Sequence, residues 1–139
     1  MQISFKVDGL DRLDRATKVA REAIAREMAI ALLASAKRIE NEAKTSIMSG
    51  DKTGIEYRRG SVVHRASAPG EAPANDTGRL VNSISSYLVK ANAEAVVTAG
   101  RGLVKYARML EFGTSKMAAR PFFFPAAEKS KIGRASCRE

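Results

Sequence analysis

The residue types that carry catalytic or metal-binding chemistry are scarce in this sequence. The chain has 139 residues and contains one histidine, His64, and one cysteine, Cys137. Zinc fingers, paired-cysteine redox sites and HExxH metalloproteases each need several such residues, so the composition excludes these classes. His64 stands between Val63 and Arg65, without the Ser, Cys or carboxylate pattern that nucleophilic catalysis requires. We therefore predict a protein that is not an enzyme and that uses no metal or cofactor.

A glycine-rich segment also proves uninformative about chemistry. Gly100-Arg101-Gly102 begins like a nucleotide-binding loop, but Lys105 occupies the position of the third glycine. The acidic residue expected about 20 residues further on is missing as well. We interpret this segment as a turn.

The charge balance is the strongest compositional signal. Lys and Arg total 24 against 15 Asp and Glu, a net charge of +9, and residues 77–120 are the most biased stretch. A surplus of this size favours contact with anionic surfaces. One hypothesis is therefore a small basic protein that binds nucleic acid without sequence specificity, for which affinity should fall steeply with salt. The longest purely apolar run, Met28–Ala34, is far shorter than the roughly 18 residues of a membrane span, so we predict no membrane association.

The first third of the chain contains the longest regular pattern. Alternating apolar residues predict a short strand over Ile3–Val7. From Leu10 to about Met48 there is no Gly or Pro, and apolar residues recur at three- and four-residue steps. This predicts one amphipathic helix. The stretch Met28–Ala36 is apolar nearly all round, so we expect the middle of the helix to be enclosed on more than one side.

The sequence pattern in the middle of the chain predicts hairpins and short helices. Strand-like stretches at Ile55–Arg58 and Ser61–Arg65 predict a hairpin, and the proline-rich continuation makes residues 51–75 a flexible segment. Thr77–Ile84 predicts a helix of two to three turns with Asp76 or Thr77 as its N-cap. A second hairpin is predicted from Ser86–Ala91 and Ala95–Ala99. A short helix over residues 104–111 should then end at Gly113 in a left-handed cap.

Three consecutive phenylalanines lie between two prolines. We predict that Met117–Phe124 is extended and that Pro125 occupies the first position of a last helix. Side chains alternate along an extended segment, so Phe122 and Phe124 should pack on the long helix near Met28–Leu33 while Phe123 lies at a subunit contact. The alternative is that all three rings cover the long helix of the same chain.

These elements predict the fold class α+β. One long N-terminal helix packs on a small antiparallel sheet, with short additional helices, in a single domain over residues 1–131. Residues 132–139 lack apolar periodicity, and we predict that they form a non-native or disordered tail.

Two stretches resemble a family of tailed-phage morphogenesis proteins. They are APGEAPANDTGRLVNSI, which ends at Ile84, and YARMLEFGTSKMAARPFFFPAAE, from Tyr106 to Glu128. In this order, after a long Ala-rich helix, they resemble the Hong Kong 97-type head–tail connector family, also called neck or tail-completion proteins, related to the minor tail protein Z group of lambda-like phages. The matching residues that we take as candidate assembly positions are Thr77, Gly78, Leu80, Ser83, Tyr106, Glu111, Phe112, Gly113, Thr114, Arg120, Pro121, Phe122, Phe123 and Pro125.

The resemblance implies a structural role in a phage or prophage virion. A family member would form a homo-oligomeric ring, hexameric in the virion, between the portal side and the tail. Its partners would be copies of itself, head-completion proteins, and tail-terminator or tail-tube proteins, with transient non-specific contact to passing DNA. Its location would be the virion neck, and the bacterial cytoplasm during assembly. Within this pattern we expect Thr77 to cap the short helix and Gly78 to allow its tight start. We also expect Glu111 to pair with a residue such as Arg120, within one subunit or across two.

Overall fold

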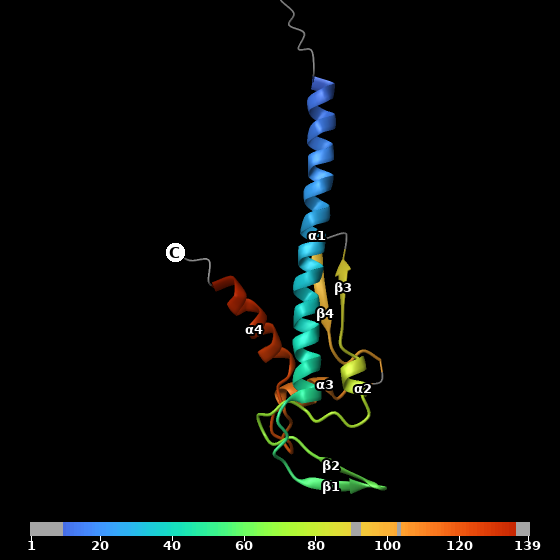
Figure 1. The fold of residues 1–139 in the computed structure, drawn as a ribbon, viewed down its shortest axis with the longest axis vertical. Helices are drawn as coiled ribbons and strands as arrows, with labels where there is room; N and C mark the ends of the chain where they lie inside the picture. Colours follow the sequence, from blue (N-terminus) through green and yellow to red (C-terminus); the bar gives the residue numbers. More distant parts are fainter. Residues whose placement is uncertain (1–9, 90–92, 103, 136–139) are drawn as a thin grey trace, which may run out of the picture.

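The computed structural model describes residues 10–89, 93–102 and 104–135, with side chains over 12–89, 93–102 and 104–130. The strand predicted at Ile3–Val7 lies outside the described residues. The observed architecture is α+β, as predicted: a long helix, two antiparallel hairpins and three shorter helices (Figure 1). No helix in the described ranges has an apolar stretch long enough to cross a bilayer.

Helix α1 spans Leu10–Ser49 and confirms the predicted long helix. Its 40 residues correspond to a length of about 60 Å at 1.5 Å per residue. It stops at Gly50, whose N–H donates to the carbonyl of Ser46 at 3.2 Å. The rest of the fold gathers around the C-terminal half of α1, while the N-terminal half projects beyond it (Figure 1).

The prediction that Met28–Ala36 is enclosed on several sides is wrong. Met28 and Ile30 are exposed, and within this stretch only Ala36 is fully buried. The buried face of α1 begins at Ala36 and runs through Ala43 to Ile47. The stretch is apolar, but the elements that pack on α1 lie further along the helix.

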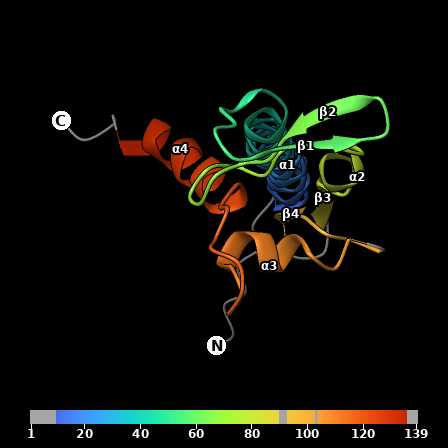
Figure 2. The same ribbon diagram turned by 90° about the horizontal axis from the view of Figure 1, so that it is seen from below.

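The two predicted hairpins are confirmed within a residue or two. Strands β3 (Ser85–Val89) and β4 (Glu94–Thr98) pair antiparallel, with Ser85 opposite Thr98, and both contact α1. Strands β1 (Glu56–Arg59) and β2 (Val62–Arg65) form a separate hairpin around a turn in which Gly60 has a φ of +65°. Seen along α1, β3 and β4 lie on one side of the helix and the β1–β2 hairpin crosses near its end (Figure 2).

The short helix of the first motif stretch is shorter than predicted. Helix α2 spans Arg79–Asn82, a single turn, and its N-cap is Gly78 in the left-handed region rather than Asp76 or Thr77. The Gly78 N–H instead donates to the side chain of Asn75 at 3.0 Å. Helix α2 therefore begins one residue later than a cap at Thr77 would place it, and two residues later than a cap at Asp76.

Two further helices complete the fold. Helix α3 spans Ala107–Phe112, and α4 spans Phe123–Ala135 and packs against α1. The backbone of residues 132–135 thus continues α4. The predicted tail character of 132–139 and the predicted mobility of 51–75 stay predictions.

Residues from α1, α2, α3 and α4 form one hydrophobic core. The fully buried large side chains are Ile47, Ile84 and Phe122. Partly buried residues from β4 and from the loop before α2 pack against this cluster. The core therefore lies at the C-terminal half of α1, where both motif stretches of the sequence meet.

Candidate assembly surface

The carboxylate of Glu111 organises the second motif stretch. Glu111 lies in α3 and is buried. One of its oxygens accepts the backbone N–H groups of Phe122 and Phe123 at 2.9 and 3.0 Å, and the other accepts that of Phe124 at 2.8 Å. Glu111 is therefore the N-terminal cap of α4, supplied from 11 residues away in the chain.

This cap accounts for every backbone donor at the start of α4. A helix leaves its first four N–H groups without intrahelical partners. At α4 these belong to Phe122, Phe123, Phe124 and Pro125, and the proline has no N–H. A negative charge at this end also interacts favourably with the helix dipole. One carboxylate therefore accepts all three N–H groups, and the fourth position, Pro125, has no N–H to satisfy.

The predicted extended conformation of Met117–Phe124 is wrong at its end. Helix α4 begins at Phe123, so Pro125 is its third residue rather than its first. A proline is tolerated in the first helical turn because no intrahelical bond is lost there. The sequence pattern did not predict the earlier start, because the cap that stabilises it comes from a different helix.

The early helix start also reverses the predicted facing of the phenylalanines. Phe122 is 2% exposed and lies in the core cluster with Ala43 and Ile47, not near Met28–Leu33. Phe123 packs partly buried against the same core, whereas Phe124 is 55% exposed. The prediction that Phe122 and Phe124 share a side and that Phe123 is the exposed ring is therefore wrong, because helical geometry replaces the two-residue alternation of a strand.

Phe124 is part of an exposed apolar surface. Its ring contacts that of Phe112 edge to face, with centroids 5.7 Å apart and planes at 66°. Phe112 is 63% exposed, and Met109, one helical turn earlier in α3, is exposed beside it. We call Met109, Phe112 and Phe124 the aromatic surface. It lies opposite the buried side of α3, which carries Ala107 and Glu111.

A tight turn joins α3 to the segment before α4. Gly113 has a φ of +75° with a ψ of −178°, so it ends α3 with positive φ but not in the predicted left-handed helical cap. A β-carbon at Gly113 would lie 2.9 Å from the backbone nitrogen of Ala119. Thr114 and Met117 exchange backbone hydrogen bonds of 2.8 and 3.2 Å and close the turn.

Arg120 links the two motif stretches, and within the subunit it does not pair with Glu111. Its backbone N–H donates to the carbonyl of Leu110 at 2.7 Å, and its Nε donates to the carbonyl of Ser67 at 3.1 Å. Nearby, the Gly70 N–H donates to the carbonyl of Ala119 at 2.9 Å. The first and second stretches, far apart in the sequence, thus lie side by side.

The other candidate positions have structural surroundings of their own. Leu80 is buried in the core. The Ser83 hydroxyl donates to the Leu80 carbonyl at 2.7 Å and accepts the N–H of Gly100 at 3.1 Å, which fixes the turn after β4 to α2. Pro121 is half-buried. Thr77 and Tyr106 line an open cleft between the β1–β2 hairpin and α2.

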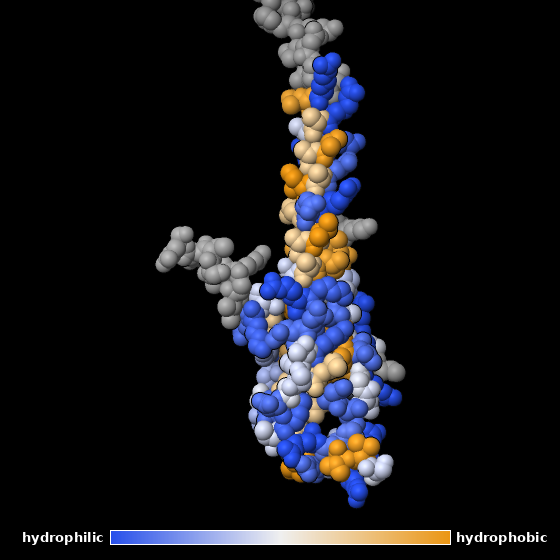
Figure 3. Space-filling model, in the orientation of Figure 1, coloured by the Kyte–Doolittle hydropathy of each residue, from blue (hydrophilic) through white to orange (hydrophobic). Residues whose placement is uncertain are grey.

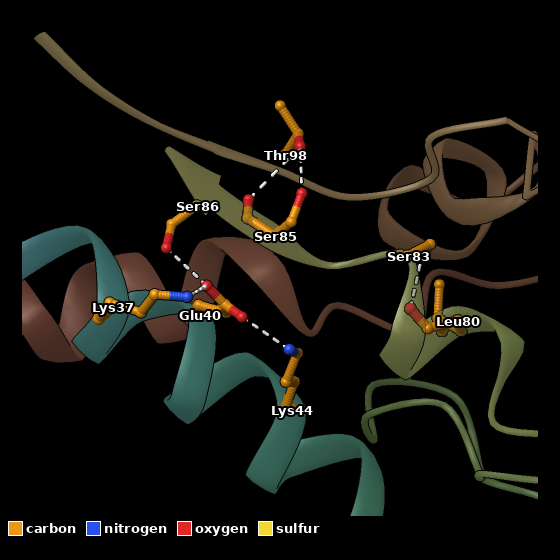
Figure 4. A network of polar contacts seen from close by, with 8 residues as sticks. All are labelled: Lys37, Glu40, Lys44, Leu80, Ser83, Ser85, Ser86 and Thr98. Carbon is orange, nitrogen blue, oxygen red and sulfur yellow. Dashed lines mark hydrogen bonds and ion pairs between the residues drawn. The ribbon is translucent and has the colours of Figure 1, made fainter. Parts of the chain in front are cut away.

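A buried carboxylate that the sequence analysis missed fastens β3 to α1. Glu40 accepts hydrogen bonds from Lys37 at 2.8 Å, Lys44 at 2.6 Å and the Ser86 hydroxyl at 2.5 Å (Figure 4). Burial by itself would raise the pKa of Glu40, but these three donors together lower it to about 2. An available signal was an acidic residue on the face of Ala36, Ala43 and Ile47, flanked by lysines one turn away on each side.

A second carboxylate ties the loop before α2 to the segment after α1. Glu71 accepts the backbone N–H of Thr53 at 3.0 Å, the Thr53 hydroxyl, and the N–H of Ala68 at 2.8 Å. The hydrogen bonds from Thr53, with that from Ala68, lower the pKa of Glu71. Both ends of the segment predicted as flexible are therefore joined to each other.

Within the described residues, no group of three or more His, Cys, Asp or Glu is placed to hold a metal ion. His64 lies in β2, where its ring stacks on Tyr57 at 5.7 Å and its Nε2 is 3.5 Å from Asp76. No protein family model, curated protein or solved structure matches this chain.

Proposed function

We propose that this protein is a structural subunit of a tailed phage or prophage that assembles with copies of itself into the ring joining head to tail. The role is mechanical: subunits pack side by side and leave a channel through which DNA passes. Support comes from the combined motif pattern of the sequence and from the surface that its residues build.

The aromatic surface is the observation that carries this proposal. Its Phe112 and Phe124 rings are more than half exposed, although Glu111 and Phe122 beside them are buried and tightly held. Burying a phenylalanine side chain is worth about 1.5–3 kcal/mol, so two exposed rings on a fixed base favour a further contact. Exposed aromatic residues and methionine are also enriched at protein interfaces.

Ring assembly is the form of contact that we favour for this surface. A ring closes when one surface of a subunit binds a different surface of the next. The helix cap gives the aromatic surface a defined direction, because Glu111 fixes α3 relative to the start of α4. The net charge of +9 suits a protein whose channel carries DNA without reading its sequence.

The same net charge favours non-specific nucleic-acid binding as the second candidate function. Most of the described basic residues are spread along α1 and the loops, and several pair with carboxylates, as Lys129 does with Glu42 at 2.6 Å. A dedicated binder should show affinity that falls steeply with salt and a defined footprint on the nucleic acid.

Two measurements on the full chain separate these functions. Sedimentation over a wide concentration range, followed by electron microscopy of the largest species, tests assembly; duplex DNA titrated at several salt concentrations tests binding. We expect closed particles and only weak DNA retention. A chain that stays monomeric at millimolar concentration while binding DNA with a steep salt dependence would replace our proposal with the second candidate.

A further inference from the structure

The open cleft beside the β1–β2 hairpin is large enough for a small ligand. Its volume is about 390 Å³, within the range of roughly 300–1,000 Å³ that is usual for ligand pockets. Its walls come from β1, from residues 66–67 and 73–80, from α3 with its N-cap, and from Arg120, so both motif stretches contribute to it. In Figure 3 the surface is hollowed at the lower end of the molecule, next to this hairpin.

Arg120 is held in the wall of this cleft at two points. Its backbone N–H donates to Leu110, and its Nε donates to the Ser67 carbonyl at 3.1 Å. Within the described residues, the terminal guanidinium nitrogens of Arg120 have no hydrogen-bond or ion-pair partner. A guanidinium presents its N–H donors as a planar fork that matches a carboxylate. The part of the fork that the fold leaves unused is therefore available to a ligand.

The positive charge of the cleft is not balanced by its own carboxylate. Arg79, exposed at the start of α2, lines the cleft and has no ion-pair partner in the part of the chain that the structure describes. Asp76 is the one acidic residue that the structure describes along the cleft. Its carboxylate already binds Arg59 and lies 3.5 Å from Nε2 of His64. Arg79 and Arg120 therefore leave the cleft with an excess of positive charge.

The hydroxyl of Ser67 has no hydrogen-bond partner among the described residues. Ser67 is 5% exposed, and its carbonyl, not its hydroxyl, bonds to Arg120. Every fully enclosed side-chain nitrogen and oxygen of the described residues has a partner, so the Ser67 hydroxyl opens on the cleft that Ser67 lines. The large majority of buried hydroxyls are hydrogen-bonded, so this free one points to a bound group.

Apolar and aromatic residues make up the other part of the lining. They include Pro73, Leu80 and Leu110, together with Tyr57 and Tyr106. A ligand that uses both parts of the cleft has one anionic group on an apolar body. Inorganic phosphate is a poorer match, because it has no apolar surface to cover this part of the lining.

We propose that this cleft binds an organic carboxylate with an apolar body. The carboxylate accepts hydrogen bonds from the terminal nitrogens of Arg120 and from the Ser67 hydroxyl, while Arg79 adds positive charge to the cleft. The apolar body packs against Tyr57 and Tyr106. A free aromatic acid and the C-terminal residue of a peptide carry the same two groups, so both sources share this chemistry. The binding does not rest on ring assembly, because no residue of the aromatic surface lines the cleft.

Titration of the full chain with model ligands tests this binding. Calorimetry is done with N-acetyl-L-phenylalanine, with its uncharged amide and with inorganic phosphate. We expect a dissociation constant of about 1 mM or below for the acid. The amide and phosphate should bind at least about tenfold more weakly, because each lacks one of the two groups that the cleft recognises. An acid that does not bind at about 10 mM, or that binds no better than the amide or phosphate, would overturn the proposal.

A short peptide separates the two sources of the carboxylate. Acetyl-Gly-Gly-Phe is titrated beside the same peptide with an amidated C-terminus. Tighter binding than that of N-acetyl-L-phenylalanine supports the proposal with chain ends as the ligand, and equal or weaker binding supports it with free acids. Equal binding of the amidated and the free peptide would contradict recognition of a carboxylate.

Two variants and a matched control test the assigned residues. Ser67→Ala keeps the carbonyl that holds Arg120 and changes no charge, so it should raise the dissociation constant of the acid about tenfold and leave thermal unfolding unchanged. Arg79→Gln removes an exposed charge and should raise this constant about three- to fivefold. Arg108→Gln, exposed in α3 and outside the cleft, should leave it unchanged. Unchanged binding by Ser67→Ala, or equal losses from the two glutamine variants, would overturn the assignment of the site.

Discussion

The carboxylate of Glu111 holds Phe124 by its backbone N–H at 2.8 Å and leaves the Phe124 ring at the surface against Phe112. One residue thus connects the interior of the fold with the surface that we propose for assembly. The neighbouring Phe122, bonded to the same carboxylate, points into the core. Within the run of three phenylalanines, this cap therefore holds one residue whose ring is buried, Phe122, and one whose ring is exposed, Phe124.

Removing the cap should destabilise the whole domain. Glu111→Ala leaves three backbone N–H groups without their acceptor, and hydrogen bonds to charged groups contribute about 1.5–3 kcal/mol each at most. Because water can replace part of this, we expect a loss of about 2–4 kcal/mol, and an intermediate loss for Glu111→Gln. Chemical denaturation measures both. The exposed Glu128→Ala on the same helix is the control, and an equal effect from both alanine variants would contradict the capping role.

Phe122 and Phe124 should contribute very different amounts to the free energy of unfolding. Phe122→Ala removes a fully buried ring and should lower the free energy of unfolding by about 3–5 kcal/mol. Phe124→Ala removes an exposed ring and should lower it by less than about 1 kcal/mol. Thermal unfolding of the two purified variants decides the matter. A larger loss for Phe124→Ala would mean that the helix start assigned to α4 is incorrect.

Gly113 should tolerate no side chain. Gly113→Ala combines a positive φ with a β-carbon 2.9 Å from the nitrogen of Ala119, so we expect a loss of about 2 kcal/mol or more. Gly60→Ala is the matched control: its φ is also positive, but nothing lies within 4 Å of the added carbon. Equal losses measured by denaturation would show that the close approach at Gly113 contributes nothing.

Stability should fall in acid because of Glu40. Its folded pKa of about 2 lies below the ordinary value of 4.5, so the native state favours the ionised form. The stabilisation is complete above about pH 4.5 and is lost as the pH falls toward 2. We expect its size to be about 1–3 kcal/mol, since one pKa unit is 1.36 kcal/mol and the two lysines are partly exposed.

The test of this pH dependence is a comparison of variants. Unfolding free energies of the protein and of Glu40→Gln are measured from pH 2 to 7. The difference between them should shrink over the acid range, while Glu27→Gln, exposed on α1, should follow the parent curve. A constant difference across the range would show that the Glu40 network does not select the ionised form.

Local patterns in the sequence were sufficient for the elements that form locally. The long helix follows from an uninterrupted three- and four-residue spacing, and both hairpins follow from short strand-like stretches separated by turn residues. The start of α4 could not be predicted in the same way, because Glu111 is 11 residues from the N–H groups that it binds. The enclosed region of α1 was misplaced for a related reason: composition shows which stretch is apolar, not which elements reach it.

The sequence pointed to the residues of the candidate site but not to the hydrogen-bond partners that they have in the structure. Glu111 and Arg120 were both singled out, yet each bonds to backbone groups rather than to the other. Opposite charges near in sequence suggested an ion pair, whereas the unsatisfied donors of a helix start gave the carboxylate a better partner. Glu40 was overlooked because its acceptor role depends on Ser86, 46 residues away.

The most direct test of the central claim compares assembly by three proteins at one set of concentrations. The parent chain, the double variant Phe112→Ser with Phe124→Ser, and the exposed-residue control Ile55→Ser are each followed by sedimentation and electron microscopy. We predict closed ring particles from the parent and from Ile55→Ser, and none from the double variant, which should keep its thermal unfolding transition. Rings formed equally by all three proteins, or by none of them, would contradict the assignment of the aromatic surface to ring assembly.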